Sequence, residues 1–215
     1  MNLPFSTEQF TAVFEKYNKA VFPMQIIFYL MAILAIYLFT RKNVTAGKMV
    51  FAILAILWLW MGIAYHLVFF TSINKGAYLF GILFILQGLL FIYSGVIRNK
   101  FAFTIQFDIY GVSGILLLLF ALLIYPVIGH FAGHAYPASP TFGLPCPTTI
   151  FTFGLLLLVS KIIPAYVLVI PFLWSLLGFS AAFSLGIYED TGLLISGLIS
   201  VPMILIRNKK IIRHI

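Results

Sequence analysis

Seven runs of apolar residues divide the chain, and its few charged residues lie between them. At about 1.5 Å per residue, helices over most of these runs approach the ~30 Å hydrocarbon thickness of a bilayer, although the fifth and seventh runs are short. None shows the period-2 alternation of a membrane strand. We predict an all-α membrane protein with seven transmembrane helices, at residues 20–40, 49–70, 77–97, 110–128, 148–163, 165–186 and 191–206.

Composition supports the same class. Of 215 residues, 63% are hydrophobic and 8% are charged, which is more apolar surface than one soluble core can bury. We therefore interpret 1–215 as a single polytopic membrane domain. Its predicted parts are an interfacial segment (1–19), a first helix triplet (20–97), a linker helix (110–128), a second triplet (148–206) and a basic cytoplasmic tail (207–215).

The distribution of lysine and arginine predicts the orientation. Taking the loops alternately, three of these residues fall on one side, at Lys16, Lys19 and Lys75. Ten fall on the other side: Arg41, Lys42, Lys48, Arg98, Lys100, Lys161, Arg207, Lys209, Lys210 and Arg213. This asymmetry favours a cytoplasmic C-terminus and an outer N-terminus. The net charge of +8 is then explained by the inner face and anionic lipid, without nucleic acid as a partner.

The first residues predict an amphipathic helix. They lack the basic and apolar regions of a cleaved signal peptide. Ser6 or Thr7 is a suitable helix cap, and Gln9 stands in the capping-box position relative to Ser6. One face of the following helix would be apolar, through Phe10, Val13, Phe14 and Tyr17. We expect an interfacial helix on the outer surface.

A shift of 116 residues superposes parts of the two triplets. Trp58 then matches Trp174, and Gly62, Gly76 and Gly81 match Gly178, Gly192 and Gly197. Because Leu, Gly and Trp are frequent in membrane helices, chance similarity is the alternative. A real repeat would give two parallel triplets joined by one linker helix, a 3+1+3 layout used by transporters.

Most of the side chains suited to ligand binding are predicted at the outer side. His66, Glu189 and Asp190 lie near outer helix ends, together with Cys146, the only cysteine. His130 and His134, at i and i+4, would share one helix face as zinc ligands do. Nearby prolines and glycines also allow the helix to end before His134. An ionisable group such as His66, one turn inside a span, usually faces the bundle or a cavity.

Four prolines between Tyr136 and Pro147 rule out a spanning helix there. Its apolar residues favour a lid folded over the helix ends. Cys146 within it is either a buried structural residue, a soft-metal ligand or a redox thiol. Phosphate-binding glycine loops, nucleophile elbows and His-Glu-x-x-His zinc motifs are absent from the sequence.

Several segments together resemble an uncharacterised bacterial seven-helix integral-membrane family, known as a domain of unknown function. They are Asn2-Leu3-Pro4-Phe5, residues 57–62, Tyr65-His66 and, most specifically, residues 140–151. The resemblance covers nearly the whole chain and implies a bacterial inner membrane, but no activity. The layout is also similar to that of seven-helix sugar transporters, although their Pro-Gln dipeptide is missing. Ceramidase-type hydrolases have a similar histidine set but carry Ser where Gly62 stands.

We hypothesise a transporter-like protein that binds a small solute or metal ion in an outer vestibule. The predicted substrate-binding residues are His66, Cys146, Glu189 and Asp190, and the predicted metal ligands are His66, His130 and His134. The alternatives are a zinc-dependent membrane hydrolase, with Zn²⁺ on the same histidines, and a non-catalytic scaffold or sensor. The expected partners are the lipid bilayer and the solute or ion, and the sequence leaves a homo-oligomer open.

Overall fold

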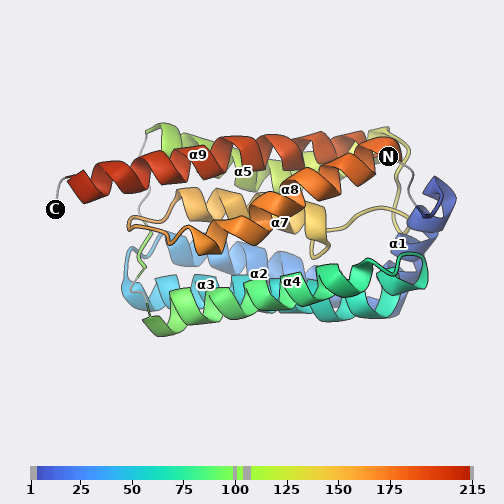
Figure 1. The fold of residues 1–215 in the computed structure, drawn as a ribbon, viewed down its shortest axis with the longest axis horizontal. Helices are drawn as coiled ribbons and strands as arrows, with labels where there is room; N and C mark the ends of the chain where they lie inside the picture. Colours follow the sequence, from blue (N-terminus) through green and yellow to red (C-terminus); the bar gives the residue numbers. More distant parts are fainter. Residues whose placement is uncertain (1–3, 99–100, 104–107, 214–215) are drawn as a thin grey trace.

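The computed structural model describes residues 4–98, 101–103 and 108–213. Most helices run along one axis, and α1 lies across one end of the bundle (Figure 1). We call this the N-terminal end, and the end where α9 finishes the C-terminal end. The helices are α1 (Thr7–Val21), α2 (Met24–Phe39), α3 (Val44–Trp60), α4 (Ala77–Phe91), α5 (Ile109–Leu119), α6 (Tyr125–Phe131), α7 (Pro145–Leu157), α8 (Tyr166–Ser184) and α9 (Thr191–Arg213).

Short π-helical or 3₁₀ segments extend several of these helices: η1 (Met61–Phe69) and η2 (Phe70–Ser72) after α3, η3 (Ile92–Arg98) after α4, η4 (Phe120–Ile124) after α5 and η5 (Tyr188–Asp190) before α9. Five continuous helical stretches are long and apolar enough to cross a membrane: Val44–Ser72, Ala77–Arg98, Ile109–Phe131, Tyr166–Ser184 and Tyr188–Arg213. A sixth counts if α1 and α2, bent by 83°, form one span. The chain is thus an all-α multi-pass membrane protein, with five or six candidate spans where the sequence predicted seven.

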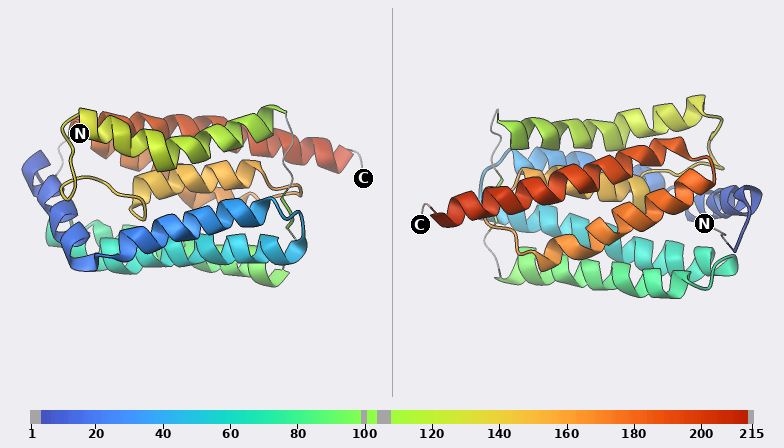
Figure 2. Two further views of the ribbon diagram at one scale, coloured as in Figure 1. Left: turned by 180° about the vertical axis from the view of Figure 1, so that it is seen from behind. Right: turned by 45° about the horizontal axis from the view of Figure 1, so that its top comes forward.

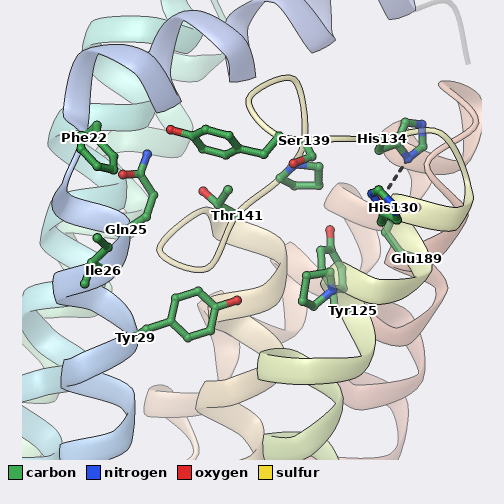
Figure 3. Close-up of a pocket in the computed structure, with 14 residues that line it drawn as sticks. Phe22, Gln25, Ile26, Tyr29, Tyr125, His130, His134, Ser139, Thr141 and Glu189 are labelled. Atoms are coloured by element: carbon green, nitrogen blue, oxygen red, sulfur yellow. Dashed lines mark hydrogen bonds and ion pairs between the residues drawn. The ribbon is translucent and has the colours of Figure 1, made fainter.

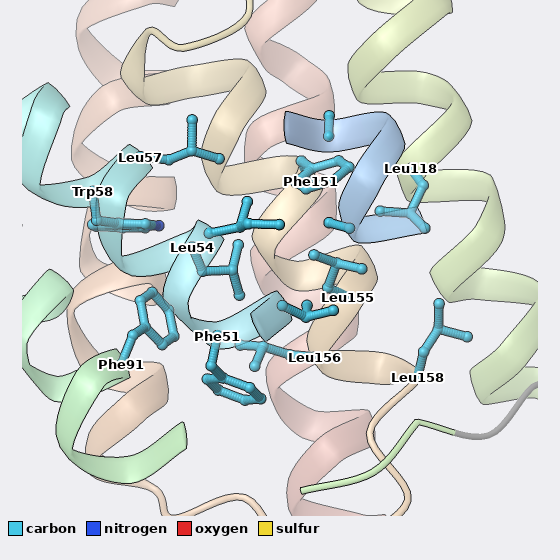
Figure 4. Packing of buried hydrophobic residues seen from close by; sticks show 14 of the residues in the cluster. Phe51, Leu54, Leu57, Trp58, Phe91, Leu118, Phe151, Leu155, Leu156 and Leu158 are labelled. Carbon is cyan, nitrogen blue, oxygen red and sulfur yellow. The ribbon is translucent and has the colours of Figure 1, made fainter. Parts of the chain in front are cut away.

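Helix α7 accounts for much of that difference. The sequence predicted a span at 148–163, but the helix runs from Pro145 to Leu157, and its 13 residues reach only about 20 Å. Nearly all of them are buried, because α5, α8 and α9 surround the helix. Figure 4 shows Phe151 and Leu155 of α7 packed beside Leu54 of α3. The fifth apolar run therefore forms the centre of the bundle and does not reach both of its ends.

The last helix extends beyond the span that the sequence predicted at 191–206. Helix α9 continues to Arg213, through most of the predicted tail 207–215, whose last two residues lie outside the described part. Lys and Arg are good helix formers, so the change from apolar to basic residues does not end the helix. Arg207 turns inward and donates to the carbonyl oxygens of Leu157 (2.6 Å) and Leu156 (3.3 Å), which caps the C-terminus of α7.

The amphipathic N-terminal helix is confirmed as α1. Ser6 and Gln9 form the expected capping box. The apolar face, however, lies on protein: Phe14 and Tyr17 are buried against Tyr65 of η1. Tyr17 also accepts a hydrogen bond from Trp60 Nε1 at 2.8 Å. The N-terminal end of the bundle supplies an aromatic surface, and the apolar face of α1 packs on that surface. This face was expected to contact lipid but contacts protein.

The structure does not confirm the internal repeat. Trp58 is buried, stacks on Phe84 and donates to Thr152 at 3.0 Å. Trp174 meets Phe84 edge-on from another side, and its side chain interacts with Cys146. Helix packing differs too, since α9 contacts both α7 and α8, whereas α3 packs between α2 and α4.

Candidate functional site

The proline-rich segment after α6 folds back over the N-terminal end, as the sequence predicted for residues 136–147. A buried asparagine of α1, Asn18, holds it in place. The Asn18 side-chain nitrogen donates to the carbonyl oxygens of Pro137 (2.7 Å) and Ser139 (2.9 Å). Its side-chain oxygen accepts from Thr141 (2.8 Å) and from Gln25 of α2 (3.2 Å). One side chain therefore ties α1 and α2 to the covering segment.

A cavity of about 400 Å³ lies beneath this segment. Figure 3 shows Gln25 and Tyr29 of α2 on one side and Tyr125, His130 and Glu189 on the other. We call this space the Glu189 cavity. Its walls combine aromatic rings with hydroxyl, amide, imidazole and carboxylate groups, which is the composition of a small-molecule site.

Glu189 is the most unusual group in this cavity. Its side chain is fully buried, and one oxygen lies 2.9 Å from His134 Nδ1. The other oxygen, Oε2, has no hydrogen-bond partner among the described residues. Gly129 of α6 leaves room for the carboxylate, because a Cβ there would lie 3.0 Å from Glu189 Oε1. A buried carboxylate oxygen without a partner is costly, and a ligand can supply the missing donor.

The next residue, Asp190, faces a second cavity. It accepts a hydrogen bond from Tyr125 at 2.6 Å and interacts with the Cys146 thiol at the start of α7. The second cavity has a volume of about 250 Å³ and lies under α1. Seven aromatic side chains line it, Trp174 among them, and we call it the aromatic cavity. The two adjacent carboxylates thus stand at the walls of two different cavities.

His66 lies apart from the other histidines. It is fully buried on η1, and neither ring nitrogen has a partner among the described residues. Its neighbours are aromatic, including Phe84 at 4.6 Å and Trp174 at 5.2 Å between ring centroids. These surroundings give no support to the predicted grouping of His66 with His130 and His134. The sequence gives the depth of His66 along its helix but not the direction in which its side chain points.

The i, i+4 histidine pair does not form on one helix face either. Helix α6 ends at Phe131, and Gly133 has a φ of +91°, so His134 lies beyond the helix. His130 is exposed, whereas His134 turns toward Glu189. Within the ranges that the structure describes, no three His, Cys, Asp or Glu residues come together in a way that could hold a metal ion.

Residues 7–214 match the family of unknown function DUF6064. The chain belongs to this family. Comparisons with curated proteins and with solved structures find no match. The family assignment agrees with the resemblance in the sequence and, like it, carries no activity, so a function has to be inferred from the site itself.

Several residues of the site were not expected from the sequence. Asn18 had no distinguishing pattern, Tyr125 looked like an ordinary residue of an apolar helix, and Gly129 was noted only as one of the residues that allow the helix to end. The one available signal was a polar residue on the apolar face of an amphipathic helix: Asn18 falls at i+4 from Phe14 and is buried beside it. His66, Cys146, Glu189 and Asp190 were predicted to share one vestibule, but they are divided between two cavities and an aromatic cluster.

Proposed function

We propose that this protein binds a small solute in the Glu189 cavity and acts as a transporter-like membrane protein. The observation that carries the proposal is the buried Glu189 carboxylate, with one oxygen unpartnered, in the wall of a cavity of about 400 Å³. Ionisable groups inside a membrane protein commonly mark a substrate or ion pathway. Among the described residues no three metal-competent side chains come together, so solute binding has more support than the zinc site that the hydrolase alternative requires.

The free groups in the cavity wall favour a solute that donates hydrogen bonds. Glu189 Oε2 is an acceptor, and so is the unpartnered side-chain oxygen of Gln25. The Gln25 amide orientation follows from its nitrogen, which donates to Asn18 O at 2.9 Å. Aromatic rings such as Tyr29 also attract cations through their faces. A small primary ammonium ion supplies both the charge and the N–H donors.

We further propose that the cavity faces outward and the C-terminus lies in the cytoplasm. The α2–α3 turn and the α7–α8 connection lie at the C-terminal end (Figure 2). They carry Arg41, Lys42 and Lys161, and α9 adds further cations there. The excess of positive residues at this end supports a cytoplasmic location. A cytoplasm-active reporter fused to the C-terminus should give signal, and activity only from a periplasm-active reporter would reverse the orientation.

Binding is tested by thermal unfolding of the purified protein in detergent. Ethylammonium should raise the unfolding temperature of the wild type with saturation, and acetate should not, because a ligand that binds only the folded state stabilises it. Glu189→Gln should abolish the shift. Glu15→Gln is the matched control, since Glu15 pairs with Lys19 on the exposed side of α1. An equal shift in Glu189→Gln, or none in the wild type, would refute the proposed site.

Transport requires a separate measurement. Wild-type protein in proteoliposomes should take up labelled methylammonium faster than Glu189→Gln or empty liposomes. Binding without uptake would reduce the function to solute sensing, the remaining alternative from the sequence.

A further inference from the structure

The aromatic cavity has its own charge and its own lining. Asp190 is buried in the cavity wall, and α1 covers the cavity. Phe70, Phe80 and Trp174 line the same cavity with their aromatic rings. Compared with the Glu189 cavity, it is smaller and less polar, with about 250 Å³ of space. A cavity of this size is below the usual range for drug-sized ligands and suits a compact one.

The charge of Asp190 is not balanced by a basic side chain. The donors around it, the Tyr125 hydroxyl and the Cys146 thiol, are neutral. In the described part of the chain, the ion pairs are Lys19 with Glu15 and His134 with Glu189, and neither includes Asp190. Buried charges in proteins are normally paired, so this carboxylate favours a cation in the adjacent space.

The two carboxylates differ in what they offer a ligand. Glu189 has an unpartnered oxygen and therefore suits a donor-bearing ammonium ion. Asp190 already accepts from Tyr125 and interacts with Cys146, so it offers charge more than a free acceptor. A cation that carries methyl groups in place of N–H donors matches that arrangement, because aromatic faces attract quaternary ammonium groups without hydrogen bonds.

We infer that the aromatic cavity is a second binding site, specific for compact quaternary ammonium compounds such as choline. Asp190 supplies the charge, and the rings of Phe70, Phe80 and Trp174 contact the methyl groups. This site does not depend on the proposed function of the Glu189 cavity, since each cavity has its own carboxylate and can be tested separately.

Cys146 allows a direct test, because it is the only cysteine and lines the aromatic cavity. We would compare its labelling by a trimethylammonium-ethyl methanethiosulfonate with that by the neutral ethyl methanethiosulfonate. Dividing the labelling rate of the cationic reagent by that of the neutral reagent removes the dependence on the thiolate fraction of Cys146. Dividing this ratio by the same ratio measured with 2-mercaptoethanol corrects for the different intrinsic reactivities of the two reagents. In the wild type the corrected ratio should favour the cationic reagent by between about twofold and thirtyfold, as expected for a cation–π site.

Two variants assign the preference to one carboxylate. Asp190→Asn should lower the corrected ratio, because only the attraction of the aromatic rings remains, whereas Glu189→Gln should leave it unchanged. Choline should slow the labelling of wild-type protein, and its neutral isostere 3,3-dimethyl-1-butanol should not. Phe70→Leu keeps the charge but removes an aromatic face, so it should weaken protection by choline even if Asp190→Asn fails to fold.

Other outcomes would overturn the inference. Equal protection by choline and by the neutral isostere would make the site merely apolar. Loss of choline protection in Glu189→Gln with retention in Asp190→Asn would assign choline to the other cavity. If Cys146 is labelled too slowly to measure, the unfolding temperature of the protein with and without choline decides. A rise with choline that persists in Glu189→Gln and disappears in Phe70→Leu supports the site. No rise in the wild type refutes it.

Discussion

Replacing Asn18 with alanine should strongly destabilise the N-terminal end. The substitution removes four side-chain hydrogen bonds, to Pro137, Ser139, Thr141 and Gln25. Each such bond contributes a net ~1 kcal/mol, so the expected loss is roughly 4 kcal/mol in the free energy of unfolding. The loss should be accompanied by release of the segment that covers the Glu189 cavity, because Asn18 is its attachment to α1.

The assay is equilibrium unfolding in mixed micelles, together with limited proteolysis of the covering segment. Asn43→Ala is the matched control, since Asn43 is an exposed helix cap at the opposite end, where it accepts from the Ala46 amide at 2.8 Å and donates to the Arg41 carbonyl oxygen at 3.2 Å. It should cost about 1 kcal/mol and leave proteolysis unchanged. If the two variants lose equal stability, or if Asn18→Ala leaves the segment resistant to protease, the hydrogen-bond argument is refuted.

Two further substitutions test how the fold supports the site. Arg207→Met should lower the free energy of unfolding by about 3 kcal/mol, because it leaves two carbonyl groups of α7 without their charged donor. The control is Arg213→Met at an exposed position, which should cost under ~0.5 kcal/mol in the same unfolding assay. Equal costs for the two variants would contradict the capping role of Arg207. Gly143→Ala should cost more than about 2 kcal/mol, since φ is +98° and the new Cβ would lie 2.1 Å from Phe28. Gly133→Ala shares the positive φ but has open space around it, so it isolates the backbone contribution, and a similar loss there would show that the contact with Phe28 is unimportant.

The elements that were predictable depend on local patterns. The capping box at Ser6 and the apolar face through Phe14 are set by residues within one or two turns, and hydropathy marks each long helix. Local chemistry also explains why the proline-rich segment folds back over the bundle. Pro137 and its neighbours cannot continue a helix, and the apolar residues of the segment avoid water.

The site was less predictable because it depends on the direction in which each side chain points as well as on its position along the helix. His66 lies among aromatic rings and His130 is exposed, and the sequence does not show in which direction either side chain points around its helix axis. Arg207 was counted as a charge of the cytoplasmic tail, although its long side chain reaches back to α7. The hydropathy of a run also does not reveal whether lipid or protein surrounds it, and so the short α7 was predicted as a span.

The short central helix has a consequence for how the chain enters the membrane. A segment of 13 residues with three threonines gives the insertion machinery a weak signal, since about 20 residues are needed to cross the bilayer. Its last carbonyl groups are satisfied by Arg207, which is synthesised some 50 residues later. Helix α7 therefore reaches its final environment only when α8 and α9 close around it. A ribosome that stops before α9 therefore releases a chain in which α7 still lacks α9 and the donor Arg207.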